Sequence, residues 1–305
     1  MIPVCNRLTY LEQALRSVLD QAPGTGEMQI EVIDNSTREA GVEDFVRRVA
    51  ESRVSYFRQP VHRTMSENWN TCLERSQGTL VHLLHDDDFV APGFYREIDT
   101  LSNRFPDVAL LVSRSFVVDE KGVVTQVTPR LTWLEESSRD ATPNYGVNLI
   151  QCPGVVMRRD FYELSGGFRT DIAFALDYEM WMRAIIRAGA AALSQPMAYY
   201  REHGAADTSE RALKGLNVWE SWKVGLLIAS YSPSLDVEVY RRWCEWNSCY
   251  QSSKFETAGN HTAAAANFRV FWKVSSLRGK VRWFFRATFD GAWKVTLKQL
   301  RYLVD

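Results

Sequence analysis

The chain has few cysteines, and none of them stands in a pairing pattern. Its 305 residues include five cysteines, an odd number, and no Cys-x-x-Cys pair occurs. They are Cys5, Cys72, Cys152, Cys244 and Cys249. A disulfide framework and a zinc site with the usual ligand spacing are therefore not expected. Unpaired cysteines fit a reducing compartment, so the sequence predicts a cytoplasmic protein.

Long hydrophobic runs are also missing. No stretch approaches the roughly 18 consecutive apolar residues of a membrane-spanning helix, and nothing at the start resembles a signal peptide. The opening residues, Met1 to Arg7, look like the end of a strand followed at once by a turn. We therefore expect either a short first strand or a natural start further upstream.

Two phosphate-binding loops are absent from the sequence. No Gly-x-Gly-x-x-Gly follows the first predicted strand, and no Gly-x-x-x-x-Gly-Lys-Ser/Thr occurs anywhere. These loops bind the phosphates of dinucleotides and nucleoside triphosphates through backbone N–H groups. If the protein binds phosphates, a metal ion would have to hold them instead.

The formal net charge of -1 conceals a basic carboxyl-terminal segment. Residues 268–305 contain nine Lys or Arg against two Asp, mixed with Phe, Trp and Tyr. A basic, aromatic-rich helix is typical of a segment that lies on an anionic membrane surface, at about 1 kcal/mol per basic residue. A helix pair that covers the core is the alternative. Nucleic acid is not an expected partner, because an acidic cluster near residue 86 would repel phosphates without a metal.

The first third of the chain alternates between strand and helix patterns on short connections. Strands are predicted at 30–33, 54–57 and from Leu80, and helices at 10–21, 42–49 and 66–75. Thr9 with Glu12 is expected to cap the first helix, and Ser66 the third. The alternation predicts an α/β fold with a doubly wound, mainly parallel sheet and helices on both faces. In such sheets, ligands bind beyond the carboxyl ends of the strands.

The stretch from Leu80 to Pro92 carries the strongest chemical signal. An apolar strand ends in His85, and three aspartates follow at 86–88. Adjacent carboxylates at the end of a buried strand raise one another's pKa, so we expect a cation there, most simply a hard divalent ion. A solvated acidic turn is the alternative. Asn6 and Asp34 follow other predicted strands, and one pocket would collect them with this cluster.

The chain beyond residue 106 is less regular. Strands are predicted at 108–112, 115–118 and 123–127, a surface loop at 130–145, a short strand at 196–201, and helices at 212–230 and 237–250. The loop has the length of an active-site lid. Adjacent Gly166 and Gly167 permit close approach of a ligand, although a plain turn is equally compatible. Asp177 falls at or near the amino end of a predicted helix, as either a cap or a catalytic group. His203 alone is more typical of a satisfied histidine than of a metal ligand.

Seven short motifs occur in a characteristic order. They are Ile-Pro-Val-Cys-Asn-Arg, Val-Ile-Asp-Asn-Ser, Ser-Glu-Asn-Trp-Asn, Leu-Leu-His-Asp-Asp-Asp, Gly-Gly-Phe, Asp-Tyr-Glu-Met-Trp-Met-Arg and Tyr-Arg-Glu-His-Gly. Their order and spacing over about residues 1–205 resemble family 2 glycosyltransferases of the GT-A fold. The resemblance implies a metal-dependent, inverting enzyme that transfers a sugar from a nucleotide diphosphate donor to an acceptor.

The resemblance also implies roles for single residues of the donor site. The nucleotide-binding set is Pro3, Cys5, Arg7, Asp34, Asn68, Asn70 and Asp86. Asp34 would accept a hydrogen bond from the base. The Asp-x-Asp motif of the family falls on the acidic cluster, at 85–87 if counted from Pro92 and at 86–88 if read from the carboxylates alone. We expect Asp86 at the ribose, and Asp87 and Asp88 as ligands of Mn²⁺ or Mg²⁺.

The remaining expected site residues come from later motifs. His203 matches a histidine that completes the metal site in relatives. Asp177 matches the catalytic base, although Leu176 stands where a Glu usually precedes it. The residues expected at the donor sugar or acceptor are Gly154, Gly167, Glu179 and Trp181.

By this resemblance, residues 1–205 form the GT-A domain. Its nucleotide-binding half would span about 1–106 and its acceptor half about 107–205, with a helical extension at 206–305. The expected donor is UDP- or dTDP-linked, the acceptor a saccharide or a lipid-linked sugar, and the role bacterial surface polysaccharide synthesis at the inner face of the membrane. The alternatives are a sugar-nucleotide nucleotidyltransferase, whose Gly-rich loop is absent, and a catalytically silent binding module of a glycan assembly complex.

Overall fold

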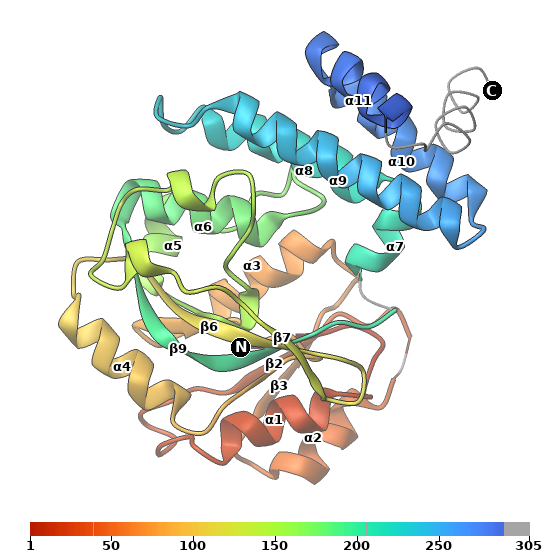
Figure 1. Cartoon of the computed structure of the whole chain (residues 1–305). Helices are drawn as coiled ribbons and strands as arrows, with labels where there is room; N and C mark the ends of the chain where they lie inside the picture. Colours follow the sequence, from red (N-terminus) through yellow and green to blue (C-terminus); the bar gives the residue numbers. More distant parts are fainter. Residues whose placement is uncertain (39, 205–206, 290–305) are drawn as a thin grey trace. The chain divides into compact units, whose positions relative to one another are not determined.

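A computed structural model describes residues 1–38, 40–204 and 207–289 of the chain (Figure 1). The chain divides into two units. The first consists of Met1–Asn144 and Asn148–Glu202, and the second of Tyr145–Val147 together with the chain from His203 onwards. Each unit is described by itself.

The first sheet has three parallel strands in the order β1-β2-β3. The elements are β1 (Ile2–Val4), α1 (Leu11–Leu19), β2 (Glu31–Asp34), α2 (Val42–Ala50), β3 (Ser55–Arg58) and α3 (Met65–Arg75). Val4 pairs with Asp34, and Asp34 with Arg58, so the carboxyl ends of the three strands lie at one edge. The predicted alternation of parallel strands with helices is confirmed here.

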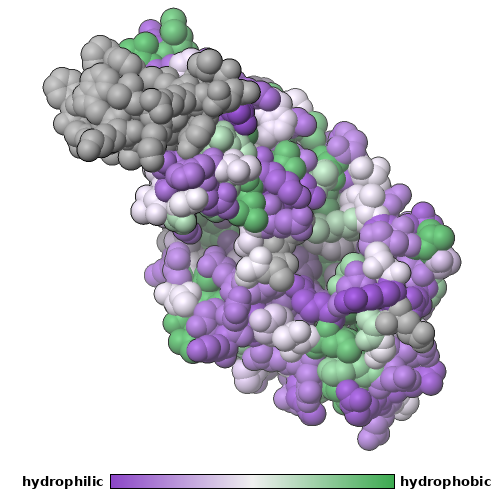
Figure 2. All heavy atoms as spheres, turned by 90° about the vertical axis from the view of Figure 1, so that its right-hand side faces the viewer, coloured by the Kyte–Doolittle hydropathy of each residue, from purple (hydrophilic) through white to green (hydrophobic). Residues whose placement is uncertain are grey.

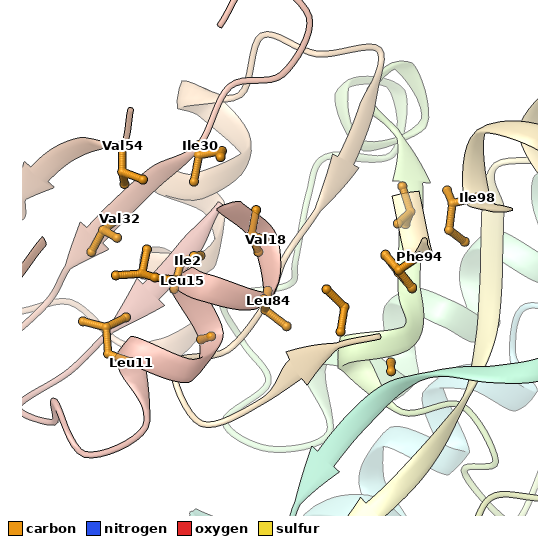
Figure 3. Close-up of a cluster of buried hydrophobic side chains, with 14 of the residues drawn as sticks. Ile2, Leu11, Leu15, Val18, Ile30, Val32, Val54, Leu84, Phe94 and Ile98 are labelled. Carbon is orange, nitrogen blue, oxygen red and sulfur yellow. The ribbon is translucent and has the colours of Figure 1, made fainter. Parts of the chain in front are cut away.

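One face of α1 explains why this helix packs against the sheet. Leu11, Leu15 and Val18 recur at helical spacing and are at most 3% exposed. With Ile2 and Val32 they belong to a buried hydrophobic cluster (Figure 3). Full burial of one such aliphatic side chain contributes about 1.5–3 kcal/mol, so the cluster holds α1 firmly against the first sheet.

Two predicted helix caps are wrong. α1 begins after Tyr10 and has no side-chain cap, so Thr9 lies outside the capping position. α3 is capped by Thr64, whose hydroxyl accepts from the Glu67 N–H while the Glu67 carboxylate accepts from the Thr64 N–H. These two residues have the spacing of a capping box, and Ser66 already lies inside the helix.

The second sheet has the order β4-β8-β6-β9-β5, with β7 paired to β6. Its strands are β4 (Leu80–His82), β5 (Phe89–Val90), β6 (Leu110–Val118), β7 (Val124–Val127), β8 (Val155–Arg158) and β9 (Ala190–Arg201). β6 and β9 run parallel, and the other pairs are antiparallel. The two strands predicted at 108–112 and 115–118 are one strand, β6, and β9 begins earlier than predicted.

The connecting elements of this unit include three α-helices and three short 3-10 helices. They are α4 (Phe94–Arg104), α5 (Arg159–Ser165), α6 (Leu176–Ala188), η1 (Thr132–Leu134), η2 (Thr142–Asn144) and η3 (Cys152–Gly154). The prediction of a surface loop at 130–145 is wrong, because Leu131, Leu134 and Ala141 are at most 3% exposed. These apolar side chains have no regular period, yet they anchor the segment to the core.

The described part of the second unit is helical. Its helices are α7 (Asp207–Leu213), α8 (Leu216–Ala229), α9 (Val237–Thr257), α10 (His261–Val274) and α11 (Leu277–Phe289). The single helix predicted at 212–230 is interrupted at Gly215, which has a φ of 68° and no room for a side chain, since a Cβ would lie 3.0 Å from the Ala266 carbonyl oxygen.

None of the described helices combines the length and apolar composition needed to cross a bilayer. On the face shown in Figure 2, hydrophobic residues are dispersed among hydrophilic ones. The basic segment predicted to contact a membrane runs from 268 to 305, and its residues 290–305 lie outside the described part of the chain. Membrane contact stays a prediction.

Candidate active site

The acidic cluster lies in a tight turn between β4 and β5. Leu83 and Leu84 continue from β4 and are at most 2% exposed, which fixes the entry to the turn. The Asp88 N–H donates to the His85 carbonyl across 3.3 Å. This turn brings the imidazole of His85 and the carboxylate of Asp88 to one side, with Nδ1 and Oδ2 3.7 Å apart.

Two arginines hold the cluster. One Arg7 nitrogen, Nη2, lies 2.6 Å from Asp86 Oδ1 and 2.7 Å from Asp87 Oδ2. Arg201, at the end of β9, donates its backbone N–H to Asp88 Oδ1 and its Nε to the Asp87 carbonyl, both at 2.9 Å. Arg7 was predicted to line the nucleotide pocket, and the structure places its guanidinium on the acidic cluster, where it supplies part of the expected positive charge.

These contacts leave two carboxylate oxygens of the cluster unsatisfied. Asp86 and Asp88 are 5% and 1% exposed, and Oδ2 of each has no hydrogen-bond partner. Burial raises the pKa of Asp86 to about 6 against the opposing effect of Arg7. Burial, with the charge of Asp87, raises the pKa of Asp88 well above its usual range. A buried carboxylate oxygen without a partner is costly, so the site is suited to a further cation.

Within the described residues, a possible metal-ligating group consists of His85, Asp87 and Asp88, whose ligand atoms lie within 4.8 Å of one another. An imidazole nitrogen with two carboxylates is a suitable donor set for Mn²⁺, and the orphaned Asp88 oxygen agrees with it. Asp87 and Asp88, which the sequence predicts as metal ligands, are members of this group. His203, the third predicted ligand, belongs to the second unit, so its part in a metal site stays a prediction.

Asp177 stands in the first turn of α6. The helix begins after Ala175, which has a φ of 60°, so Asp177 is inside the helix and is not its N-cap residue. Its Oδ1 accepts the Tyr178 N–H at 2.7 Å. Burial raises the pKa of the carboxyl, while the Tyr178 hydrogen bond and His85 oppose this. Burial lowers the pKa of His85, and the charges of Asp87 and Asp177 oppose that shift. Asp177 therefore faces the same cluster electrostatically.

The predicted base pocket lies at the end of β1 and β2. Asp34 is 1% exposed; its Oδ1 accepts the Ser36 N–H at 2.9 Å, and its Oδ2 accepts the Tyr56 hydroxyl at 2.7 Å. Pro3 is buried within β1, whereas Cys5, which follows the strand, is exposed. The Asp34 carboxylate is therefore satisfied by the loop that follows β2 and by Tyr56 on β3.

Asn70 and Gly167 meet, although the sequence assigned them to different parts of the site. Gly167 has a φ of 71°, and a Cβ there would lie 2.6 Å from Asn70 Oδ1. Asn70 accepts the Phe168 N–H and donates to the Phe168 carbonyl, both at 2.8 Å. Asn68 is buried and accepts from Gln59. Asn70 thus fastens the glycine turn to α3, so these contacts are internal to the protein.

Three residues predicted at the donor sugar or acceptor are enclosed by the chain. Glu179 and Trp181 are 0% and 1% exposed, and the Glu179 carboxylate receives Arg183 Nε at 2.9 Å. Gly154 is also buried, and a side chain there would collide with the Ser113 carbonyl oxygen. The side chains of Glu179 and Trp181 therefore lie in the core of the first unit, and the backbone of Gly154 packs against Ser113; their role at the donor sugar or acceptor stays a prediction.

The structure adds residues that the sequence analysis did not assign. Burial, with the charges of Asp88 and Asp177, raises the pKa of Tyr200. Cys152 Sγ lies 3.4 Å from His85 Nε2. Tyr200 and Arg201 stand beside His203 in the Tyr-Arg-Glu-His-Gly motif, which was the available signal; nothing in the sequence pointed to Cys152.

Comparisons with known proteins find similar sequences. Residues 1–165 match the family model described as Glycosyl transferase family 2. A similar protein is the "Uncharacterized protein MT1568" of Mycobacterium tuberculosis, 26% identical over 253 residues that cover 76% of each chain.

Two solved structures have a similar fold. S. aureus TarS 1-349, in complex with UDP-GlcNAc, has a TM-score of 0.63 at 14% identity, over 99% of this chain and 87% of that one. The mannosyltransferase PcManGT from Pyrobaculum calidifontis, in complex with GDP-Man and Mn²⁺, has a TM-score of 0.58 at 14% identity, over 99% and 83%. At these identities the likeness concerns the fold.

Proposed function

Since the chain belongs to glycosyl transferase family 2, we propose that it is an inverting, metal-dependent enzyme that transfers a sugar from a UDP- or dTDP-linked donor. The acceptor would be a saccharide or a lipid-linked sugar in surface polysaccharide synthesis. The GT-A domain would span 1–205, with the donor held by about 1–106 and the acceptor by about 107–205. UDP-GlcNAc in TarS and GDP-Man with Mn²⁺ in PcManGT support a nucleotide-sugar donor.

The observation that carries this proposal is the incomplete acidic cluster with Asp177 beside it. His85, Asp87 and Asp88 offer one nitrogen and two carboxylates to a cation, and Asp88 keeps one oxygen unsatisfied. A divalent ion bound there would neutralise the diphosphate that leaves the donor sugar. Arg7 contacts Asp87, one of these two carboxylates, so its guanidinium would turn to a diphosphate oxygen when a cation takes over Asp87.

Asp177 is the proposed general base. Its carboxylate would remove the proton from an acceptor hydroxyl as the oxygen attacks the anomeric carbon in line with the leaving diphosphate. Because burial raises the pKa of Asp177 toward the working pH, the carboxylate would be a stronger base than an exposed aspartate. The Tyr178 N–H that binds Oδ1 orients the group, leaving Oδ2 to take the proton.

Replacement of this carboxylate tests the proposal. Asp177→Asn keeps the size of the side chain and its bond to the Tyr178 N–H, yet removes the base, so transfer should fall by about 10²- to 10⁴-fold. UDP binding, measured by calorimetry with Mn²⁺, should stay within a few-fold of wild type. Asp160→Asn, an exposed aspartate on α5, is the matched control. A large loss of UDP affinity in Asp177→Asn would count against the assignment, and absence of both donor hydrolysis and transfer in the wild type would favour a silent binding module.

A further inference from the structure

The ring of His85 is held from three sides. Its Nδ1 points to Asp88 Oδ2 at 3.7 Å, and its Nε2 lies 3.4 Å from Cys152 Sγ. Trp69 packs against the imidazole at a centroid distance of 5.0 Å with the planes 32° apart. These contacts define the orientation of the ring.

A second contact of Cys152 indicates which ring nitrogen of His85 carries the hydrogen. Cys152 opens η3 and is 4% exposed, and its thiol donates to the Leu83 carbonyl at 3.7 Å. A carbonyl oxygen can only accept, so the single thiol hydrogen is directed there and the sulfur lone pairs face His85. Sulfur can then only accept from Nε2, which places the hydrogen of the neutral imidazole on Nε2.

The opposite tautomer fits the distances less well. With the hydrogen on Nδ1, the imidazole would donate to Asp88 Oδ2, but 3.7 Å is too long for an N–H···O hydrogen bond. In agreement, Asp88 Oδ2 is buried and has no hydrogen-bond partner. With the hydrogen on Nε2, the lone pair of Nδ1 faces Asp88 Oδ2, an arrangement that is favourable only with a proton or a metal cation between them.

We propose that Cys152 is a positioning residue: it accepts from His85 Nε2–H and thereby presents His85 Nδ1, with Asp87 and Asp88, to a divalent cation. The inference rests on the metal site of the proposed function. A partner on the second ring nitrogen fixes the tautomer of a histidine ligand, and loss of such a partner typically weakens metal binding about 10- to 100-fold. The mixed nitrogen and oxygen donor set also predicts tighter binding of Mn²⁺ than of Mg²⁺.

The tautomer can be measured without any metal. Long-range ¹H–¹⁵N correlation spectra of the full chain, labelled with ¹⁵N and treated with chelator, distinguish the two ring nitrogens of each histidine. The His85 signals are assigned by their loss in His85→Gln. We expect the Nε2–H form in the wild type. A spectrum of the Nδ1–H form would overturn the inference, whatever the outcome for metal or transfer.

The effect on the cation is measured as Mn²⁺ affinity, from the loss of the free-ion electron paramagnetic resonance signal. Cys152→Ala should weaken binding about 10- to 100-fold. Cys152→Ser should recover part of the affinity, because a hydroxyl oxygen can also accept from Nε2–H. Cys72→Ala is the matched control, since Cys72 is a buried cysteine on α3 outside the proposed ligand group. The Mn²⁺ affinity of this variant should equal that of the wild type.

The outcomes separate this inference from the proposed function. Equal Mn²⁺ affinity in the wild type and Cys152→Ala would overturn the role of Cys152 while the metal site stands. No Mn²⁺ binding by the wild type would overturn the metal site and the inference together. If Cys152→Ala fails to fold, two measurements still test the role of Cys152: the tautomer of His85 in the wild type and the Mn²⁺ affinity of Cys152→Ser. A Cys152→Ser variant that folds but does not bind Mn²⁺ would contradict this role.

Discussion

At the end of β2, both oxygens of Asp34 accept hydrogen bonds from the chain itself, whereas at the end of β4 Asp86 and Asp88 each leave one oxygen without a partner. Both carboxylate sites are buried, and both follow strands whose carboxyl ends are expected to face a ligand. They differ in what the surrounding residues supply. Asp34 receives a hydroxyl and a backbone N–H, whereas the cluster receives the guanidinium of Arg7 and the backbone N–H and guanidinium of Arg201.

Two acidic sites in the same unit are therefore suited to different ligands, a neutral N–H donor at Asp34 and a cation at the acidic cluster. A carboxylate that is already satisfied is rigid and keeps further lone pairs for a neutral N–H donor, as a nucleotide base would offer. A buried carboxylate oxygen without a partner destabilises the metal-free protein. A bound cation removes this cost, so the second site favours metal binding. The predictions below test this contrast.

The largest effect is expected at Asp88. Asp88→Asn removes the charge of the unsatisfied oxygen, so Mn²⁺ should bind at least about 100-fold more weakly, a larger loss than the one expected for Cys152→Ala. The metal-free protein should be no less stable than wild type, because the amide oxygen can still accept the Arg201 N–H. Mn²⁺ titration and thermal unfolding with chelator check both points, with Asp160→Asn as control. Lower stability of the metal-free variant would contradict the contrast.

The cost of burying the Asp86 carboxylate should also appear in the pH dependence of stability. The pKa of Asp86 rises from 3.8 to about 6 in the folded protein, so the folded state binds this proton more tightly than the unfolded state. The free energy of unfolding should therefore fall as pH rises from about 4 to 6, by on the order of 2 kcal/mol, since one pKa unit corresponds to about 1.4 kcal/mol. Urea unfolding with chelator measures this, and Asp86→Asn should flatten the slope.

A change at Asp34 should act in the opposite direction on stability. Asp34→Asn replaces one of two charge-assisted hydrogen bonds by a weaker contact, so the metal-free protein should lose about 1–2 kcal/mol. UDP binding should weaken as well, while Mn²⁺ affinity in the absence of nucleotide stays unchanged. Urea unfolding and titration with Mn²⁺ alone separate the two effects. A variant as stable as wild type would show that Asp34 is not held as described.

The smallest effect is expected at Tyr56. Tyr56→Phe removes only the hydroxyl that binds Asp34 Oδ2, which should cost about 1 kcal/mol of unfolding free energy. Tyr199→Phe, a partly exposed tyrosine of β9, is a matched control expected to cost less. Coupling is checked by combining Tyr56→Phe with Asp34→Asn: the double variant should be less destabilised than the sum of the two, because both remove the same bond.

Much of the first sheet could be predicted from the sequence, because strand and helix patterns there follow one another with the periods of their side chains. The position of Asp34 and of the acidic cluster at strand ends followed from the same pattern. The second sheet was harder. β6 contains Ser113, Arg114 and Ser115 in its middle, which interrupt the apolar run, yet both serines are 1% exposed in the folded strand. Periodicity alone divided this strand in two.

The candidate site was predictable where a residue's role depends on its own position in a motif, and not where it depends on distant partners. Asp87 and Asp88 were found from their neighbours. Cys152 approaches His85 from 67 residues away, and Arg201 reaches Asp88 from 113 residues away, which no local pattern encodes. Glu179 was expected at the donor sugar or acceptor; its burial follows from an ion pair with Arg183, one helical turn later, which the motif alone did not indicate.

The central claim is that the incomplete cluster binds a nucleoside diphosphate through a divalent cation. Calorimetric titration of the purified protein with UDP, GDP and dTDP, each with Mn²⁺, with Mg²⁺ and with chelator, tests it most directly. We expect that one nucleotide, UDP or dTDP, binds in the presence of Mn²⁺ and that chelator abolishes this binding. Binding that is equally strong with chelator, or no binding of any nucleotide under all three conditions, would contradict it.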